Sequence, residues 1–231
     1  MTPAPIHLGG ERLLLDPMGG LAWPEAGVLA VADLHLEKGT AAARRGQLVP
    51  PWDTGATLDR LARLVRRWEP GTLVLLGDSF HDARGAARLA AADRARLAGL
   101  AEGRRVVWVL GNHDPVAPEG LPGEAVTLWE HGPLTFRHEA RRGAAAGGEV
   151  SGHFHPKAAV LTRAGRVSRP CFVIDARRVV LPALGAYTGG LDVGNPAIAG
   201  LFPRGGRAFL LGEGRLFSFT LGQIGRQAAP A

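Results

Sequence analysis

Three apolar runs in the first half of the chain are each followed at once by charged or amide side chains. The runs are residues 28–32, 72–76 and 106–110, and the segments after them are DLHLEKG, GDSFHD and GNHDP. Apolar runs of this length predict buried strands, and ligand sites in α/β sheets gather at the carboxyl ends of strands. The pattern therefore predicts a functional site along one edge of a sheet.

Periodic apolar residues predict two helical regions between these runs. The first covers residues 55–68, with Asp53 or Thr54 as its N-cap. The second covers residues 83–100, and Asp93 caps its last turns after a break. Strands that alternate with helices in this way are typical of the α/β class.

The rest of the chain fits short strands separated by glycine and proline. Residues 6–8 and 12–15 predict an N-terminal hairpin around a Gly-Gly turn. Eight runs in the second half fit the strand pattern: 125–128, 133–137, 149–151, 159–162, 172–175, 179–181, 207–211 and 216–220. Residues 141–148, RRGAAAGG, predict a mobile loop.

Length and composition narrow the class of protein. At 231 residues the chain is expected to form a single domain, residues 1–231. It has no run of 18 apolar residues and no basic start followed by an apolar stretch. We therefore expect neither a membrane span nor a secretory signal, and a cytoplasmic location. The single cysteine, Cys171, lies in an apolar run and is predicted to be buried; it excludes an intramolecular disulfide and a Cys-based zinc site.

The net charge of the chain does not decide whether its partner is a nucleic acid. A net charge of +6 and a sequence pI near 10.8 suit an acidic partner such as nucleic acid. However, the only lysines are Lys38 and Lys157, so arginine carries nearly all of the positive charge. A GC-rich genome produces the same bias, so charge alone does not decide the question.

Two aspartates, an asparagine and five histidines follow the predicted strands in one order. They are Asp33, His35, Asp78, Asn112, His113, His138, His153 and His155. D-x-H and G-D are weak signals alone, whereas G-N-H-D is much more specific. Strand alternation would place Asp33 and His35 on one side of the backbone, as two ligands of one metal require.

The donor atoms in this set are nitrogen and oxygen without sulfur. Such a set suits Mn, Fe or Zn rather than Cu(I) or an iron–sulfur cluster. It is large enough for two metal ions that share one carboxylate. Two ions roughly 3.5–4 Å apart stabilise both the attacking and the leaving oxygen at phosphorus. The chemistry that the set predicts is phosphoester hydrolysis.

In this order, D-x-H, G-D, G-N-H-D, H and G-H-x-H resemble the calcineurin-type metallophosphoesterases. The resemblance implies an α/β sandwich of two mixed β-sheets flanked by helices. It also implies that four residues bind a first divalent metal ion: Asp33, His35, Asp78 and His155. Four bind a second, with the aspartate as the bridge: Asp78, Asn112, His138 and His153. His131, seven residues before His138, is the alternative ligand at that position.

The resemblance gives His113 and Asp114 catalytic roles. His113 would stand off the metal ions and give a hydrogen bond or a proton to the phosphate or the leaving oxygen. Asp114 would orient the imidazole of His113. Around the motifs, ADLHLEKG, ARRGQLVPPWDT, GPLTFRHE, SGHFHPKA and LPALGAYTGGLDV are similar to one bacterial subgroup, so the resemblance covers almost the whole chain.

That subgroup is the DNA-ligase-associated metallophosphoesterases, the PdeM-like endonucleases. The resemblance to this subgroup implies a phosphodiesterase that depends on Mn²⁺; Fe and Zn are the alternative metals. Its implied substrate is DNA, expected to be single-stranded, and its implied role is in the DNA damage response. An ATP-dependent DNA ligase, a helicase and a second nuclease are the implied functional partners. Four residues are further candidates for substrate binding: Lys38, Arg44, Arg45 and His81. A plain surface role remains the alternative for the three cations, and a hydrogen bond that supports a ligand is the alternative for His81.

Two other functions are compatible with the same fold. One is hydrolysis of a small molecule, either a nucleotide-sugar lipid or a cyclic nucleotide. A lipid substrate calls for an apolar lid, but the segment after His113, DPVAPEGLPGE, is polar and rich in proline and glycine. The other is a non-catalytic interaction scaffold, which would lack ligands or the catalytic histidine. Here every position is filled.

Overall fold

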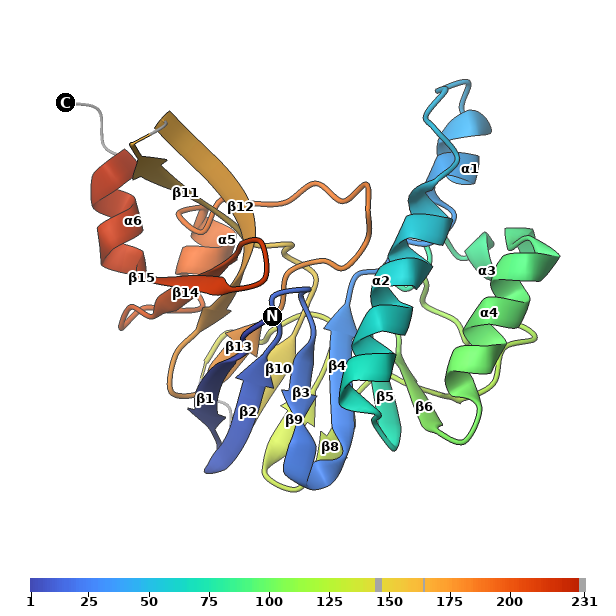
Figure 1. The fold of residues 1–231 in the computed structure, drawn as a ribbon, viewed down its shortest axis with the longest axis horizontal. Coiled ribbons are helices and arrows are strands. Elements are labelled where there is room, and N and C mark those ends of the chain that lie inside the picture. Colours follow the sequence, from blue (N-terminus) through green and yellow to red (C-terminus); the bar gives the residue numbers. More distant parts are fainter. Residues whose placement is uncertain (144–146, 164, 229–231) are drawn as a thin grey trace.

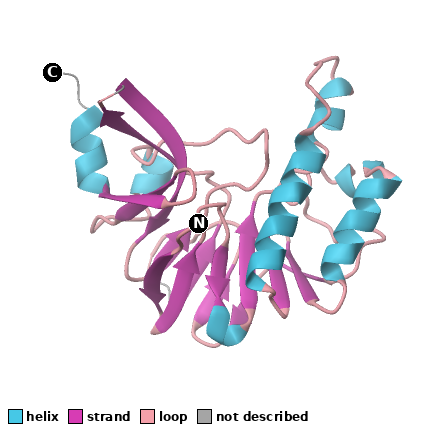
Figure 2. Ribbon diagram, in the orientation of Figure 1, coloured by secondary structure: helices cyan, strands magenta, loops and turns pink. Residues whose placement is uncertain are grey.

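Two β-sheets pack face to face at the centre of the molecule, and helices cover their outer faces (Figures 1 and 2). The structure is a computed structural model and describes residues 1–143, 147–163 and 165–228. Each sheet contains both parallel and antiparallel pairs. The expected sandwich of two mixed sheets flanked by helices is confirmed.

The first sheet has seven strands in the order of the sequence. They are β1 (Ala4–Leu8), β2 (Glu11–Leu15), β3 (Leu21–Trp23), β4 (Val28–Ala32), β5 (Thr72–Leu76), β6 (Arg105–Val109) and β7 (Glu124–Val126). The second sheet has the order β15-β14-β12-β13-β10-β9-β8, with β11 paired to β12. Its strands are β8 (Trp129–His131), β9 (Leu134–Phe136), β10 (Gly148–Ser151), β11 (Lys157–Thr162), β12 (Gly165–Ile174), β13 (Arg178–Val180), β14 (Arg207–Leu211) and β15 (Leu216–Thr220).

The helices fall into two groups. Between the strands of the first sheet lie η1 (Pro24–Ala26), α1 (Lys38–Ala43), α2 (Asp53–Trp68), α3 (Gly85–Arg88) and α4 (Ala91–Ala101). In the last part of the chain lie α5 (Pro196–Ala199) and α6 (Leu221–Ala228). Within the described residues, no helix is both long enough and apolar enough to cross a membrane.

Parallel pairing brings the ends of the motif strands to one edge. β4, β5 and β6 are parallel neighbours in the first sheet, and β9 and β10 are parallel neighbours in the second. Ala32, the last residue of β4, forms a parallel bridge with Ala183, which lies three residues beyond β13, so the two sheets meet at this edge. The residues that follow all five motif strands are therefore brought to the same end of the sandwich.

Three apolar clusters hold the layers together. The central one joins the inner faces of both sheets, with Leu13, Phe136 and Phe172 fully buried. A second packs α2 and α4 against the outer face of the first sheet. The third lies on the other side of the second sheet, beneath α5 and α6. Cys171 is buried there, and burial raises the pKa of its thiol, which confirms that it packs as a small apolar residue.

The predicted caps of α2 are wrong. The helix begins at Asp53, and Trp52 at its N-cap makes no side-chain hydrogen bond. The carboxylate of Asp53 instead accepts the backbone N–H of Gly39 (2.9 Å), and the hydroxyl of Thr54 accepts that of Glu37 (2.9 Å). The two side chains hold the turn that leads into α1, which the sequence did not reveal as a helix.

Other element boundaries differ by a few residues from those predicted. The second helical region breaks at Leu89 and Ala90 rather than near Asp93, which lies in the first turn of α4. β12 is much longer than the predicted 172–175 because it also pairs with β11. β3 and β8, three residues each, were missed. Of the predicted loop 141–148, residues 144–146 lie outside the described part of the chain, and Gly148 belongs to β10.

Candidate metal centre

The candidate ligands lie in loops with an unusual backbone. Seven non-glycine residues in the described part of the chain have positive φ, and five of them are candidate ligands: Asp33 (φ 54°), His35 (44°), Asp78 (45°), His153 (71°) and His155 (45°). A positive φ is strained for residues with a Cβ, and such strain clusters at functional sites. The side chains of Asp33 and His35 are therefore brought to the same site by the left-handed backbone conformation of these two residues, which lie beyond the end of β4. The expected strand alternation does not place them there.

The glycines in the motifs leave room for ligands. A Cβ at Gly77 would overlap the imidazole of His138, and one at Gly111 would overlap the carboxylate of Asp78. At Gly152 it would lie 2.6 Å from Oδ2 of Asp33. Backbone and ligand approach so closely here that only glycine fits.

We expect Gly111→Ala to weaken Mn²⁺ binding about 10–100-fold, because the added methyl group must displace Asp78. Isothermal titration calorimetry measures the affinity. Gly99→Ala is the matched control, since a Cβ at that glycine meets nothing within 4 Å. Equal affinities in the two variants would contradict the close-packing argument.

Asp33, His35 and His155 form one group of potential ligands. Nε2 of His35 lies 3.2 Å from Nε2 of His155, which is 3.5 Å from Oδ1 of Asp33. Both aspartates of the centre, Asp33 and Asp78, are almost fully buried. The two imidazole nitrogens thus face one another beside a buried carboxylate.

Asp78, His138 and His153 form a second group, which Asn112 completes. Oδ1 of Asn112 lies 2.9 Å from both Nε2 of His138 and Nδ1 of His153, and these two nitrogens are 3.0 Å apart. On the far side of its ring, Nδ1 of His138 lies 3.1 Å from the carbonyl oxygen of Leu76. A carbonyl only accepts, so Nδ1 carries the proton and Nε2 is free to bind a metal.

Oδ2 of Asp78 lies between the two groups. It is 3.8 Å from Nε2 of His35 in the first group and 3.4 Å from Nε2 of His138 in the second. A carboxylate oxygen at this place, close to ligands of both groups, can bridge two metal ions.

The spacing of the donor atoms fits metal ions. With bonds of about 2.0–2.1 Å, ligands at neighbouring corners of a tetrahedral or octahedral site lie about 2.8–3.4 Å apart. The imidazole pairs of the two groups, at 3.2 Å and 3.0 Å, match that spacing. Imidazole, carboxylate and amide ligands also suit a divalent ion of the Mn–Zn series.

Burial and the charges of neighbouring ligands together set the pKa values of the ligands. Burial, followed by the nearby imidazole of His155, lowers the pKa of His35 to about 3, so its ring is neutral, as a metal ligand must be. For Asp78 burial opposes ionisation, but the hydrogen bond and charge of His138 outweigh it and lower the pKa to about 2. For His138 burial favours the neutral ring, but Asp78 and Asp33 outweigh it and raise the pKa to about 9. A metal ion would compete with that proton.

The family is decided by comparison with known proteins. A family model described as calcineurin-like phosphoesterase matches residues 27–175, which include every candidate ligand. The chain belongs to the calcineurin-like phosphoesterase family. It is therefore a phosphodiester hydrolase that binds divalent metal ions. A search of curated proteins finds no match.

Two solved structures are similar to this phosphoesterase. The Pseudomonas putida nuclease MPE is 30% identical, with a TM-score of 0.69 over 94% of this chain and 100% of that one. A phosphoesterase from Escherichia coli, Yfce, is 17% identical, with a TM-score of 0.43 over 84% of this chain and 98% of that one.

His113 lies beside the ligands of the phosphoesterase with its imidazole partly exposed. Nε2 is 4.0 Å from Oδ2 of Asp78, and the backbone N–H donates to Oδ1 of the same carboxylate (2.9 Å). The ring stacks on that of His81 with centroids 5.3 Å apart, and Nδ1 lies 2.8 Å from the carbonyl oxygen of His81. His81, His113 and His35 form a third group of nearby nitrogens, but it includes no carboxylate.

The expected contact between Asp114 and the imidazole of His113 is not what the structure shows. Asp114 is buried and accepts the backbone N–H groups of Phe80 and Gly111, both at 3.1 Å. Burial raises its pKa to about 6 against these hydrogen bonds. Asp114 thus ties the loop after β6 to the loop after β5, and the carbonyl of His81 orients the imidazole instead.

The other predicted residues lie around the centre. His131, the alternative to His138, lies outside it and packs on Trp23 and Trp129. Lys38 is partly buried, and its ammonium donates to the carbonyl of Tyr187 (2.8 Å). Arg44 and Arg45 are exposed at the end of α1.

Sequence reasoning missed one side chain at the centre. Oε1 of Glu139 lies 3.8 Å from Nε2 of His153, on the side of the ring away from Asn112. A carboxylate in this position favours the tautomer that leaves Nδ1 free. Its only signal in the sequence is its place directly after His138.

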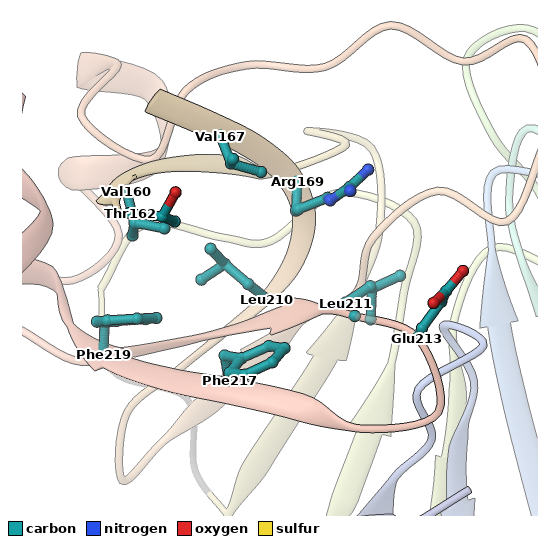
Figure 3. A pocket seen from close by; sticks show the side chains of 10 residues that line it. Val160, Thr162, Val167, Arg169, Leu210, Leu211, Glu213, Phe217 and Phe219 are labelled. Carbon is teal, nitrogen blue, oxygen red and sulfur yellow. The ribbon is translucent and has the colours of Figure 1, made fainter. Parts of the chain in front are cut away.

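A separate pocket lies away from the ligands. Figure 3 shows it between the β11–β12 hairpin and β14–β15. Its volume is 530 Å³, and its mainly apolar lining includes Val160, Leu210 and Phe217. None of the candidate ligands lines it. The chemistry of the family therefore belongs to the open edge of the sandwich and not to this pocket.

Proposed function

We propose that the protein is an endonuclease that hydrolyses phosphodiester bonds of single-stranded DNA with two divalent metal ions, Mn²⁺ by preference. The observation that carries this proposal is the position of Asp78 between two ligand groups. The similarity to a Pseudomonas putida nuclease over nearly the full length supports nucleic acid as the substrate.

The first ion would be held by Asp33, His35, Asp78 and His155, and the second by Asp78, Asn112, His138 and His153. Ions bound there would activate the attacking water and neutralise charge that develops on the phosphoryl oxygens. The protein itself contributes a buried, preorganised frame. Hydrogen bonds from the backbone of His113 and His153 fix the two aspartates, so the carboxylates keep their positions through the reaction.

His113 is the proton donor in this proposal. Because the carbonyl of His81 only accepts, Nδ1 of His113 carries a fixed proton, and Nε2 is the nitrogen that exchanges one. Nε2 is near the bridging carboxylate without belonging to a carboxylate-bearing ligand group. From there it can protonate the leaving oxygen as the P–O bond breaks.

DNA repair alongside an ATP-dependent ligase, a helicase and a second nuclease remains part of the proposal, on the strength of the flanking segments. An enzyme with such a DNA substrate is expected in the cytoplasm. Membership of the ligase complex would appear as co-purification of the ligase with the tagged protein from cell extract.

A lipid-linked diphosphate is the second candidate substrate, because three large apolar side chains are exposed in the loop between α1 and α2. They are Leu48 (95% exposed), Val49 (40%) and Trp52 (72%). Such side chains could enter a bilayer. This candidate predicts hydrolysis stimulated by vesicles that carry the diphosphate lipid and no cleavage of DNA.

Cleavage of circular single-stranded DNA tests the main proposal. With Mn²⁺ the protein should convert closed circles to linear strands, a reaction that an exonuclease cannot begin, and EDTA should stop it. Asp33→Ala, purified in parallel, should be inactive and controls for a contaminating nuclease. If the protein hydrolyses bis(p-nitrophenyl) phosphate but leaves both circular and linear strands intact, DNA is not its substrate.

A further inference from the structure

A groove lined by four arginines lies next to the metal centre. Its volume is 480 Å³, within the roughly 300–1,000 Å³ range of small-ligand sites. It is lined by Ala41, Arg44, Arg45, Asp82, Ala83, Arg84 and Arg88, and we call it the arginine groove. One wall is the end of α1. The other is the turn that leads into α3, together with Arg88, the last residue of that helix. Figure 1 shows α1 and α3 at the same end of the first sheet.

The walls are held together by one of the arginines. Arg88 donates two hydrogen bonds to the carboxylate of Asp82, at 2.8 Å and 2.7 Å, and a third from Nε to the hydroxyl of Thr40 in α1 (3.1 Å). The hydrogen bonds from Arg88 lower the pKa of Asp82, so the carboxylate stays ionised and is paired with the guanidinium of Arg88. The only carboxylate in the lining is thus occupied.

The guanidinium groups of the other three arginines of the groove are not paired with this carboxylate. Arg44, Arg45 and Arg84 are exposed, and within the described part of the chain none of their side chains makes a hydrogen bond or an ion pair. Arg96 and Arg105 are also exposed, but each of them is paired with a carboxylate. Three unpaired ones around a single groove form a surface that attracts polyanions.

The groove is continuous with the catalytic residues. His81 precedes Asp82 directly, and its ring stacks on that of His113 while its carbonyl oxygen lies 2.8 Å from Nδ1 of His113. On the other wall, α1 begins at Lys38, three residues after the candidate ligand His35. The loop after β5 therefore presents His81 to the imidazole of His113 and the residues that follow it to the groove.

We propose that the arginine groove binds the sugar–phosphate backbone of the substrate strand beyond the scissile bond, so that the strand leaves the metal centre between α1 and α3. This inference rests on the proposed nuclease activity. Arg44, Arg45 and Arg84 contact phosphates of flanking nucleotides. Arg88 fixes the spacing of the two walls through its hydrogen bonds to Asp82 and Thr40. Arginine suits this task because its planar fork binds two phosphate oxygens at once.

The test compares two variants of equal charge. Arg44→Gln/Arg45→Gln/Arg84→Gln removes the free arginines of the groove. Arg12→Gln/Arg63→Gln/Arg66→Gln removes three exposed arginines on β2 and α2 that line no part of it. Thermal melting confirms that both fold. Binding of fluorescent oligo(dT) is followed by anisotropy in EDTA at several salt concentrations, where no hydrolysis interferes.

The groove variant should bind oligo(dT) at least about tenfold more weakly than the control variant. Its slope of log K against log salt should fall by about 0.7 for each phosphate that the variant no longer binds. In Mn²⁺, its loss in kcat/KM on oligo(dT) should exceed its loss on bis(p-nitrophenyl) phosphate at least tenfold, because only the long strand reaches the groove.

Equal binding losses in the two variants would overturn the proposal, since charge alone would then explain them. Equal losses on the long and the small substrate would also overturn it and place the arginines at the reacting phosphate. If the wild-type protein binds oligo(dT) but cleaves only the small diester, the proposed nuclease activity fails, and the anisotropy comparison still decides whether the groove binds the strand.

Discussion

Asp78→Ala is expected to lower the rate of phosphodiester hydrolysis at least about 10³-fold and to remove the binding of both metal ions. Oδ2 of Asp78 is the atom between the two ligand groups, 3.8 Å from His35 and 3.4 Å from His138. Losing it affects both ions at once, and metal ions contribute several kcal/mol of transition-state stabilisation, with each 1.36 kcal/mol worth tenfold in rate. Metal content after gel filtration and steady-state kinetics with Mn²⁺ measure the two effects.

A readout that does not depend on activity separates this loss from misfolding. If Mn²⁺ binds the folded centre and not the unfolded chain, as we propose, it should raise the melting temperature of the wild-type protein. Asp78→Ala should melt at one temperature with and without Mn²⁺. Asp78→Asn should disturb the fold less than Asp78→Ala, because the amide oxygen of asparagine can still accept the backbone N–H of His113, which Oδ1 of Asp78 accepts in the wild-type protein. A fully active Asp78→Ala protein, or one that retains both ions, would show that the carboxylate is not shared.

The ligand set could be predicted from the sequence because each ligand lies within four residues of the end of a strand. Motifs such as G-N-H-D and G-H-x-H fix several donors within a few residues, and parallel pairing of β4, β5 and β6 then brings distant motifs together. The way Asp33 and His35 converge was not accessible. Alternation ends where β4 ends, at Ala32. The left-handed backbone of the two ligands beyond it depends on hydrogen bonds to Gly77 and Asp78, in the loop after the neighbouring strand β5.

Side chains with several possible partners were the least predictable. Asp53 and Thr54 fit the N-cap pattern, but in the fold they hold the turn before α1. Asp114 follows His113 directly, yet it binds two backbone N–H groups while a carbonyl orients the ring. Every residue carries a carbonyl, so no sequence pattern marks this one. The choice among such partners is made by tertiary packing.

The arginines illustrate the same limit. The sequence shows only their number, and a biased genome explains an excess of them. Pairing distinguishes them: Arg88 is bound to Asp82 and Thr40, whereas Arg84, four residues earlier, makes no side-chain hydrogen bond in the described structure. Only the structure shows which arginines near the metal centre are paired with a carboxylate and which are not.

His113→Ala is expected to leave both metal ions bound and to slow DNA cleavage about 10²–10⁴-fold, the usual contribution of a general acid. Metal binding should survive because Asp33, Asp78 and the other imidazoles keep their positions, and the backbone N–H of residue 113 still reaches Asp78. Metal content and the Mn²⁺-dependent rise in melting temperature should match those of the wild-type protein. Loss of an ion would show that His113 is a ligand.

The leaving group distinguishes proton transfer from a simple hydrogen bond to the phosphate. A deoxyribose oxygen must be protonated as it leaves, whereas p-nitrophenolate leaves without a proton. If Nε2 of His113 is the acid, His113→Ala should lose far less activity on bis(p-nitrophenyl) phosphate than on oligo(dT). If the imidazole only binds a phosphoryl oxygen, both substrates contain that oxygen and both should lose activity equally. The carbonyl of His81, which fixes the proton on Nδ1, makes the first result the one we expect.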